Sequence, residues 1–348
     1  MSQLSREEKT ADWTVPGAHE VARGVYRIPL PLPQDGLAAI NVYALTGEAG
    51  LVLVDGGWAV SRAREQLELA LKSLGYGLGD IRRFLVTHMH RDHYTQAMQL
   101  RREFGVEVSL GAGEDLALEY ARRPDGRMFG PQIEALRSLG AASLADIVSE
   151  IAKRDGNDDV RNWDDPDVWL KDGDLIPISD RVLEVVNTPG HTRGHVVFHD
   201  LDAQLLFAGD HVLPTITPSL GFEPVPGQNP LGDFLRSLTV VRSRPDAMLL
   251  PAHGAVVPSA HRRVDALIDH HGRRLDETEV AVRHGAHTVY QIAGQLYWTS
   301  SVRRLDELDP FNQMLAVIET RWHLEMLVVQ DRLLQSTEGE TLHYRTAG

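Results

Sequence analysis

The chain has 348 residues, of which 43% are hydrophobic, so it can bury a full core and exceeds the usual size of a single domain. Its formal net charge of −14 disfavours polyanionic partners such as nucleic acids and anionic membrane surfaces. It has no cysteine, which excludes disulfides and thiolate ligands and leaves imidazole and carboxylate as the strong metal donors.

Residues 1–14 are polar and charged, and no apolar run is long enough to cross a bilayer, so we expect a cytoplasmic protein with no membrane partner. The first predicted strands cover residues 21–29, 38–46 and 51–55. The third predicted strand ends at Asp55, which precedes two glycines. An Asp followed by glycines is common in turns. Residues 61–74 have helical spacing of leucines and should lie on the sheet.

A dense group of metal-binding residue types follows the β-rich run at residues 84–87. His88, His90, Asp92 and His93 stand within six positions, at the point where a strand should turn into a helix. A strand end can direct alternate residues the same way, and the start of the helix then faces the same space. Three imidazoles and a carboxylate there predict a metal site rather than a solvated loop.

Two metal ions need more ligands than one turn supplies, and later strand ends offer them. His191 follows the strand-like run 182–186, after a Pro-Gly turn. Asp210 ends the apolar run that begins at residue 205, and His253 follows another that begins at residue 248. Four separate strand ends therefore present candidate ligands.

The segment between residues 113 and 174 has a different pattern. Residues 114–122, 131–139 and 143–153 each show helical spacing, and an acidic, aromatic stretch follows. Such helices could cover a site or pack away from it as a decoration. Candidate walls of a substrate pocket are Tyr120, Met128, Phe129, Trp163 and the proline-stiffened residues 211–218.

The C-terminal residues 259–348 are predicted to be mostly helical. Helices are expected over 261–275, 277–284, 289–297 and 310–331, followed by a small hairpin near Gly339. Residues 261–348 hold ten Arg, no Lys and thirteen Asp or Glu, a net charge of −3. Because a groove-reading module normally has a basic face, we favour packing or formation of a homodimer over contact with nucleic acid.

Taken together, the ordered His and Asp segments resemble the metallo-β-lactamase superfamily, whose members carry an HxHxDH turn and later single His, Asp and His ligands. The resemblance covers about residues 20–258. It implies an α/β fold, an αββα sandwich with metals at one edge, carried by residues 1–258. The insertion at about 113–174 would then be a lid over that edge, and residues 259–348 resemble the winged-helix appendage of some members.

Carried over by position, the resemblance assigns the first metal to His88, His90 and His191 and the second to Asp92, His93 and His253. Asp210 would bridge the two. Asp55 would support the ligand loops by hydrogen bonds or be a turn residue, and His195 would lie outside the ligand set. His211 could touch substrate or lie on the surface. Two zinc ions are favoured, with iron or manganese as alternatives.

The implied chemistry is hydrolysis by a water shared between two metals, which lower its pKa and polarise the scissile carbonyl, with Asp92 orienting the nucleophile. A complete ligand set is typical of glyoxalase II-like thioesterases and lactonases, so we expect a small-molecule thioester, ester or lactone as substrate. A phosphodiesterase or ribonuclease is the alternative, and a β-lactam hydrolase is less favoured. An iron-dependent redox relative would need a flavin domain, for which the remaining residues are too few and too helical.

Overall fold

Two mixed β-sheets form the centre of the computed structural model, which describes residues 12–33, 36–47, 50–123, 129–153, 159–298 and 302–347. The first sheet has seven strands in the order β1 to β7, of which β4 to β7 run parallel. Its strands are β1 (His19–Ala22), β2 (Val25–Pro31), β3 (Ala39–Gly47), β4 (Gly50–Val54), β5 (Ile81–Val86), β6 (Glu107–Gly111) and β7 (Val168–Leu170).

The second sheet has five strands in the order β12-β11-β10-β9-β8, and only its β11 and β12 pair in parallel. Its strands are β8 (Leu175–Ile178), β9 (Arg181–Asn187), β10 (Val196–Asp200), β11 (Leu205–Gly209) and β12 (Met248–Pro251). Short 3₁₀ turns elsewhere are Leu78–Asp80, Ala112–Glu114, Val160–Trp163 and Leu305–Glu307.

Alternation along the strands explains why the sheets pack face to face. In β4, Val52 and Val54 point into the core between the sheets, whereas Leu51 and Leu53 point to the outer face. In β11, Leu205 and Phe207 point inward and their neighbours point outward. Because successive side chains face opposite ways, strands that are apolar on both faces must be covered on both faces.

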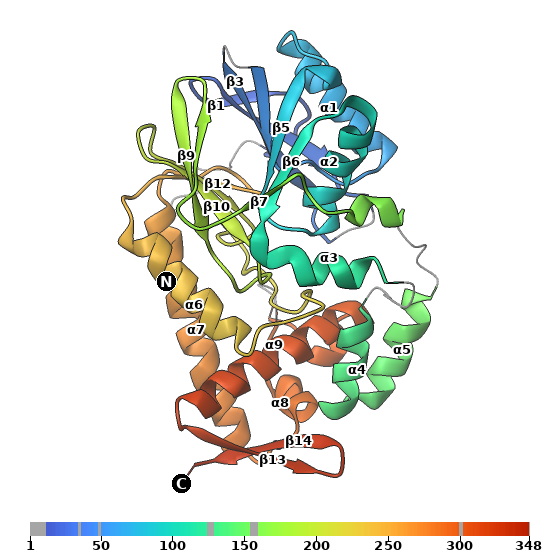
Figure 1. Ribbon diagram of the computed structural model, residues 1–348. Helices are drawn as coiled ribbons and strands as arrows, with labels where there is room; N and C mark the ends of the chain where they lie inside the picture. The colour runs from blue at the N-terminus through green and yellow to red at the C-terminus, as the bar shows by residue number, and fades with distance from the viewer. Residues whose placement is uncertain are drawn as a thin grey trace.

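Helices supply the outer cover on each side (Figure 1). The first sheet is covered by α1 (Ser61–Ser73), α2 (Arg91–Phe104) and α3 (Asp115–Ala121), and the second by α6 (Pro230–Ser243) and α7 (Ala260–Arg283). The result is four layers, so the predicted αββα sandwich is confirmed. One continuous helix, α7, stands where the sequence predicted two, because nothing at residue 276 interrupts it.

The remaining helices form a block that we call the helical unit, made of α4, α5, α8, α9 and the β13–β14 hairpin (Figure 1). Its bounds are α4 (Gly130–Ser138), α5 (Ala142–Ala152), α8 (Val289–Gln295), α9 (Pro310–Val329), β13 (Leu333–Glu338) and β14 (Thr341–Thr346). α9 lies at its centre, with Met314, Val317 and Leu324 fully buried. Both α4 and α5 pack against α9 and share its core, so the insertion and the C-terminal region are joined in one unit.

The predicted mostly helical C-terminal region is therefore present, with a hairpin at its end. An isolated bridge between Thr288 and His343 also ties that hairpin to the start of α8. The winged-helix resemblance and the boundary at residue 258 stay predictions. Among the described residues, no helix has both the length and the apolar character needed to span a membrane.

A close backbone approach joins the two sheets next to the edge where the candidate ligands lie. Gly111 ends β6, and a Cβ there would overlap the carbonyl oxygen of Gly194, which lies three residues after His191. A Cβ at Gly194 would in turn overlap the backbone nitrogen of Glu114. The two connections can touch only because they carry glycine.

We predict that Gly111→Ala destabilises the protein by about 1–3 kcal/mol, because backbone on both sides must shift to admit the methyl group. Gly272→Ala is the matched control: this glycine lies inside α7 with no neighbouring atom in the way, so the change should stabilise by about 0.5–1 kcal/mol. Chemical denaturation of both variants measures these effects. Equal behaviour of the two variants would contradict the close-packing argument.

Candidate metal centre

The seven predicted ligands converge at one edge of the sandwich, where strands of both sheets end. His88 and His90 lie in the turn after β5, and Asp92 and His93 begin α2. The other three lie beyond the ends of β9, β11 and β12 in the second sheet. All are buried except His90 and Asp92, which are partly exposed, so the site opens on that side.

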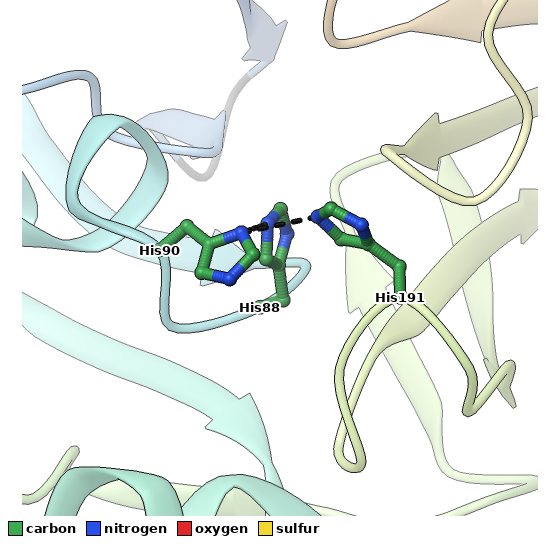
Figure 2. Close-up of side chains that lie close together, drawn as sticks. All are labelled: His88, His90 and His191. Carbon is green, nitrogen blue, oxygen red and sulfur yellow. Dashed lines mark hydrogen bonds between the residues drawn. The ribbon is translucent and has the colours of Figure 1, made fainter. Parts of the chain in front are cut away.

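Three imidazoles form the first group, shown in Figure 2. His90 Nδ1 lies 2.9 Å from His88 Nε2 and 3.0 Å from His191 Nε2. A zinc ion with ligand bonds of 2.0–2.1 Å holds nitrogen atoms about 3.3 Å apart in tetrahedral geometry, close to these separations. The three rings could therefore hold one metal ion.

Asp92, His93 and His253 form the second group. His253 Nε2 lies 3.4 Å from Asp92 Oδ2, and His93 Nε2 lies 3.7 Å from the same oxygen. One carboxylate and two imidazoles are a donor set that zinc accepts readily. This group could hold a second ion.

Asp210 stands between the two groups. Its Oδ2 lies 3.4 Å from His191 Nε2 in the first group, and its Oδ1 lies 3.4 Å from His253 Nε2 and 3.7 Å from His93 Nε2 in the second. A single carboxylate thus presents one oxygen to each group. This is the arrangement that a bridging ligand requires.

Buried polar atoms without partners show that the site suits a cation. In the described part of the chain, His93 Nε2, His253 Nε2 and Asp210 Oδ1 are buried and make no hydrogen bond. A buried polar atom that lacks a partner costs free energy, so such atoms are normally paired. All three point at their neighbours in the cluster, where a bound metal ion would satisfy them together.

Hydrogen bonds on the far side of the rings fix which nitrogen faces the cluster. Nδ1 of His93 donates to Asp55 Oδ2 at 3.0 Å, that of His191 to the carbonyl of Ser219 at 2.6 Å, and that of His253 to the carbonyl of Ala39 at 2.8 Å. With the proton on Nδ1, each Nε2 keeps its lone pair for a metal.

Asp55 therefore has the supporting role and is more than a turn residue. Its Oδ1 also accepts the backbone N–H of Thr87 at 2.8 Å, and the residue is 2% exposed with a φ of 63°. A positive φ in a residue other than glycine is unfavourable and is kept where the surroundings impose it. Asp55 joins the end of β4 to the turn that carries His88.

The histidines of the two groups differ in their pKa values when no metal is bound. Burial and the neighbouring imidazoles, first that of His93, hold the pKa of His88 well below its usual value. Burial also opposes protonation of His93, but the carboxylates of Asp55, Asp92 and Asp210 overcome it and raise its pKa to about 9. For His253 the carboxylates of Asp210 and Asp92 likewise overcome burial and raise the pKa to about 10.

Two further histidines lie behind the cluster. His195 Nδ1 pairs with Thr188 Oγ1 at 2.8 Å, and its Nε2 accepts the backbone N–H of Asp210 at 3.2 Å, so it helps to position Asp210. His211 is fully buried against the ring of Phe234, so of its two predicted alternatives the surface position is wrong. Burial lowers the pKa of His211 to about 3, which keeps the ring neutral.

Glu114, which has no predicted role in the sequence, is fully buried beside the ligand loops. Its carboxylate accepts hydrogen bonds from Thr192 Oγ1 and from the backbone of Met89, the neighbours of His191 and His88. Burial and the nearby Glu223 raise the pKa of Glu114 well above its usual value. Glu114 joins the two loops, but a glutamate at a helix start has no sequence signal that distinguishes it from a surface residue.

Of the predicted pocket walls, Phe129 contacts the ring of Phe222. The ring centroid of Phe222 lies in turn 5.7 Å from that of His90, so Phe129 lies near the site. Trp163 instead packs into the core cluster shared by α2 and α3, so it is not supported as a wall. Met128 lies outside the described residues, and for Tyr120 the role stays a prediction.

Comparison with known proteins agrees with this geometry. Residues 35–253 match the profile of the Metallo-beta-lactamase superfamily. The solved structure of a metallo-beta-lactamase family protein from Thermus thermophilus is 26% identical, with a TM-score of 0.77 over 94% of this chain and 100% of that one.

Two curated relatives are also similar. The probable metallo-hydrolase YqjP of Bacillus subtilis is 22% identical over 341 residues, which are 92% of this chain and 96% of the relative. The hydroxyacylglutathione hydrolase GloC of Haemophilus influenzae is 25% identical over 218 residues, 60% of this chain and 82% of that protein. With more than half of its length matched and its His and Asp clusters at the edge of an αββα sandwich, this chain belongs to the metallo-beta-lactamase superfamily.

Proposed function

We propose that the protein is a hydrolase with two zinc ions that cleaves a carboxylic thioester. The position of Asp210 carries the proposal, since its two oxygens face two separate ligand groups. The similarity to a hydroxyacylglutathione hydrolase supports a thioester as the substrate. Esters and lactones present the same carbonyl carbon and are the nearest alternatives.

Metal ions bound here would lower the pKa of a coordinated water and polarise the acyl carbonyl. Hydrolysis of a thioester adds the oxygen of a water molecule to the carbonyl carbon and breaks the carbon–sulfur bond. The water's two protons are shared between the products, a carboxylic acid and a thiol. Asp92 is partly exposed at the open side, so its carboxylate can both bind a metal and accept a hydrogen bond from the water. Asp55, His195 and Glu114 hold the ligands in place from behind, without touching the substrate.

The two groups should bind zinc with different pH dependence. Below about pH 9 the rings of His93 and His253 are positively charged in the metal-free protein. Zinc must therefore displace the Nε2 proton of each ring to enter the second group. Affinity there should rise with pH and level off above about pH 10. The first group should be almost independent of pH above neutrality, since the pKa of His88, of His90 and of His191 is lowered.

Calorimetry in buffers of different ionisation enthalpy, with zinc counted by mass spectrometry, measures this. We expect two binding events, of which one releases up to two protons near pH 7. Binding of both ions without proton release would contradict the assignment of His93 and His253 to the second group.

Activity should depend on the cluster as a unit. Zinc-loaded protein should hydrolyse thioesters faster than it cleaves a β-lactam or RNA, and a chelator should abolish the reaction. His90→Ala should lose bound zinc and at least about a hundred-fold in kcat/KM, because the first metal loses one of three imidazoles. His343→Ala, in the hairpin strand β14, is the matched control and should retain both.

Thioester hydrolysis by metal-free protein, or full activity of His90→Ala, would exclude the proposal. Faster cleavage of RNA than of every thioester would favour the phosphodiesterase alternative instead.

A further inference from the structure

The loop at residues 219–223 connects the metal cluster with the helical unit. On the cluster side, the carbonyl of Ser219 accepts the Nδ1 proton of His191. On the other side, Trp322 in α9 donates from Nε1 to the carbonyl of Leu220 at 3.0 Å. The loop is therefore held by a predicted ligand and by α9 at adjacent residues.

Gln132 in α4 holds the rest of this loop. Its Nε2 lies 3.1, 3.0 and 3.2 Å from the carbonyl oxygens of Gly221, Phe222 and Glu223. Gln132 is only 5% exposed, and the two N–H groups of its amide are shared among these three carbonyls. Both parts of the helical unit, the insertion and the C-terminal region, thus fix the position of Phe222.

Three phenylalanines meet at this point, and we call them the aromatic cluster: Phe129, Phe222 and Phe311. The ring of Phe222 lies 5.8 Å from that of Phe311 and 6.3 Å from that of Phe129, and the last two lie 5.1 Å apart. Phe129 precedes α4, and Phe311 lies in the first turn of α9. The three segments are far apart in the sequence.

The aromatic cluster contacts the metal site at one end and extends away from it. Phe222 is in edge contact with His90, at 5.7 Å between centroids, and Phe311 follows at 5.8 Å. Each of the three rings is only partly buried, unlike the fully buried Phe84, Phe198 and Phe207 of the sandwich core. The aromatic cluster therefore keeps apolar surface that a bound molecule could cover.

A cavity of about 230 Å³ beside the His191 loop has a mixed lining. It includes the charged residues Arg193, Glu223 and Asp233 as well as Pro189 and Pro230. A charged group that is covered by an apolar chain loses its water, so the three charged side chains disfavour such a chain there. An apolar part of a substrate is better placed on the phenylalanine rings.

We propose that the aromatic cluster is the subsite for the acyl chain, so that the protein prefers thioesters of medium-chain apolar acids to acetyl thioesters. This rests on the proposed function, since it places the acyl carbonyl at the first metal group beside His90. The remaining apolar chain then lies along Phe222 toward Phe311. In this arrangement the helical unit determines the substrate specificity of a site whose ligands all come from the sandwich.

The test compares acetyl, hexanoyl and decanoyl thioesters of N-acetylcysteamine on the zinc-loaded full chain. Wild-type kcat/KM should rise at least about ten-fold from acetyl to decanoyl, as burial of apolar groups on the rings predicts. Phe311→Ala should lose about ten-fold on decanoyl and least on acetyl. Phe311→Trp should move the preference toward shorter chains, because the larger ring fills part of the subsite. If the alanine variant folds poorly, the tryptophan variant still tests the subsite.

Phe104→Ala is the matched control, because Phe104 ends α2, lies beside Gly79 and is 42% exposed. It should keep the chain-length preference of the wild type. Zinc content and thermal unfolding of every variant show whether the change is one of specificity or of folding.

The outcomes separate the two proposals. If wild type and both Phe311 variants hydrolyse all three thioesters with the same relative rates, the acyl subsite is excluded while thioester hydrolysis stands. If no thioester is hydrolysed, calorimetric binding of decanoate and acetate is measured instead. Tighter decanoate binding that Phe311→Ala abolishes supports the subsite without the hydrolase, whereas equal binding of both acids overturns the subsite as well.

Discussion

The carboxylate of Asp210 is the feature on which the site depends, because it places one oxygen beside each of the two ligand groups. His191 belongs to the first group and His253 to the second, yet both Nε2 atoms lie 3.4 Å from an oxygen of Asp210. Buried charges are tolerated only when they are paired. Without a metal, protons on His93 and His253 partly balance the acids, as their raised pKa values indicate. With metals, the cations take over that role.

The sandwich makes this arrangement possible because each ligand loop is anchored on an element other than its own strand. Asn41 in β3 donates to the carbonyls of Pro251 and Gly254, on either side of His253. Glu114 joins the loops of both sheets through Thr192. The ligand atoms are therefore set by hydrogen bonds between elements distant in the sequence, and a change in one anchor should move a ligand that it does not touch.

The convergence of the candidate ligands at one edge could be predicted from the sequence, whereas their surroundings could not. His88, His90 and His93 are recognisable by their density in one turn, and the later candidate ligands by their place at strand ends. No such pattern marks Glu114, since burial of a glutamate depends on two other loops closing over it. Gly111 and Gly194 likewise read as ordinary turn residues until their backbones are seen to touch.

The contacts of Phe311 likewise could not be predicted from the sequence, because they depend on how distant segments pack. Its spacing within α9 predicts a helix, but its contacts with Phe129 and Phe222 follow from the packing of α9 against an insertion about 180 residues earlier in the chain. Treating the insertion as a lid and the C-terminal region as a separate appendage conceals that they share one core. A shared core means that the wall beside His90 cannot be altered from one segment alone, because α4 and α9 hold the same loop. Variation in either segment can therefore change what the site accepts while every predicted metal ligand stays in place.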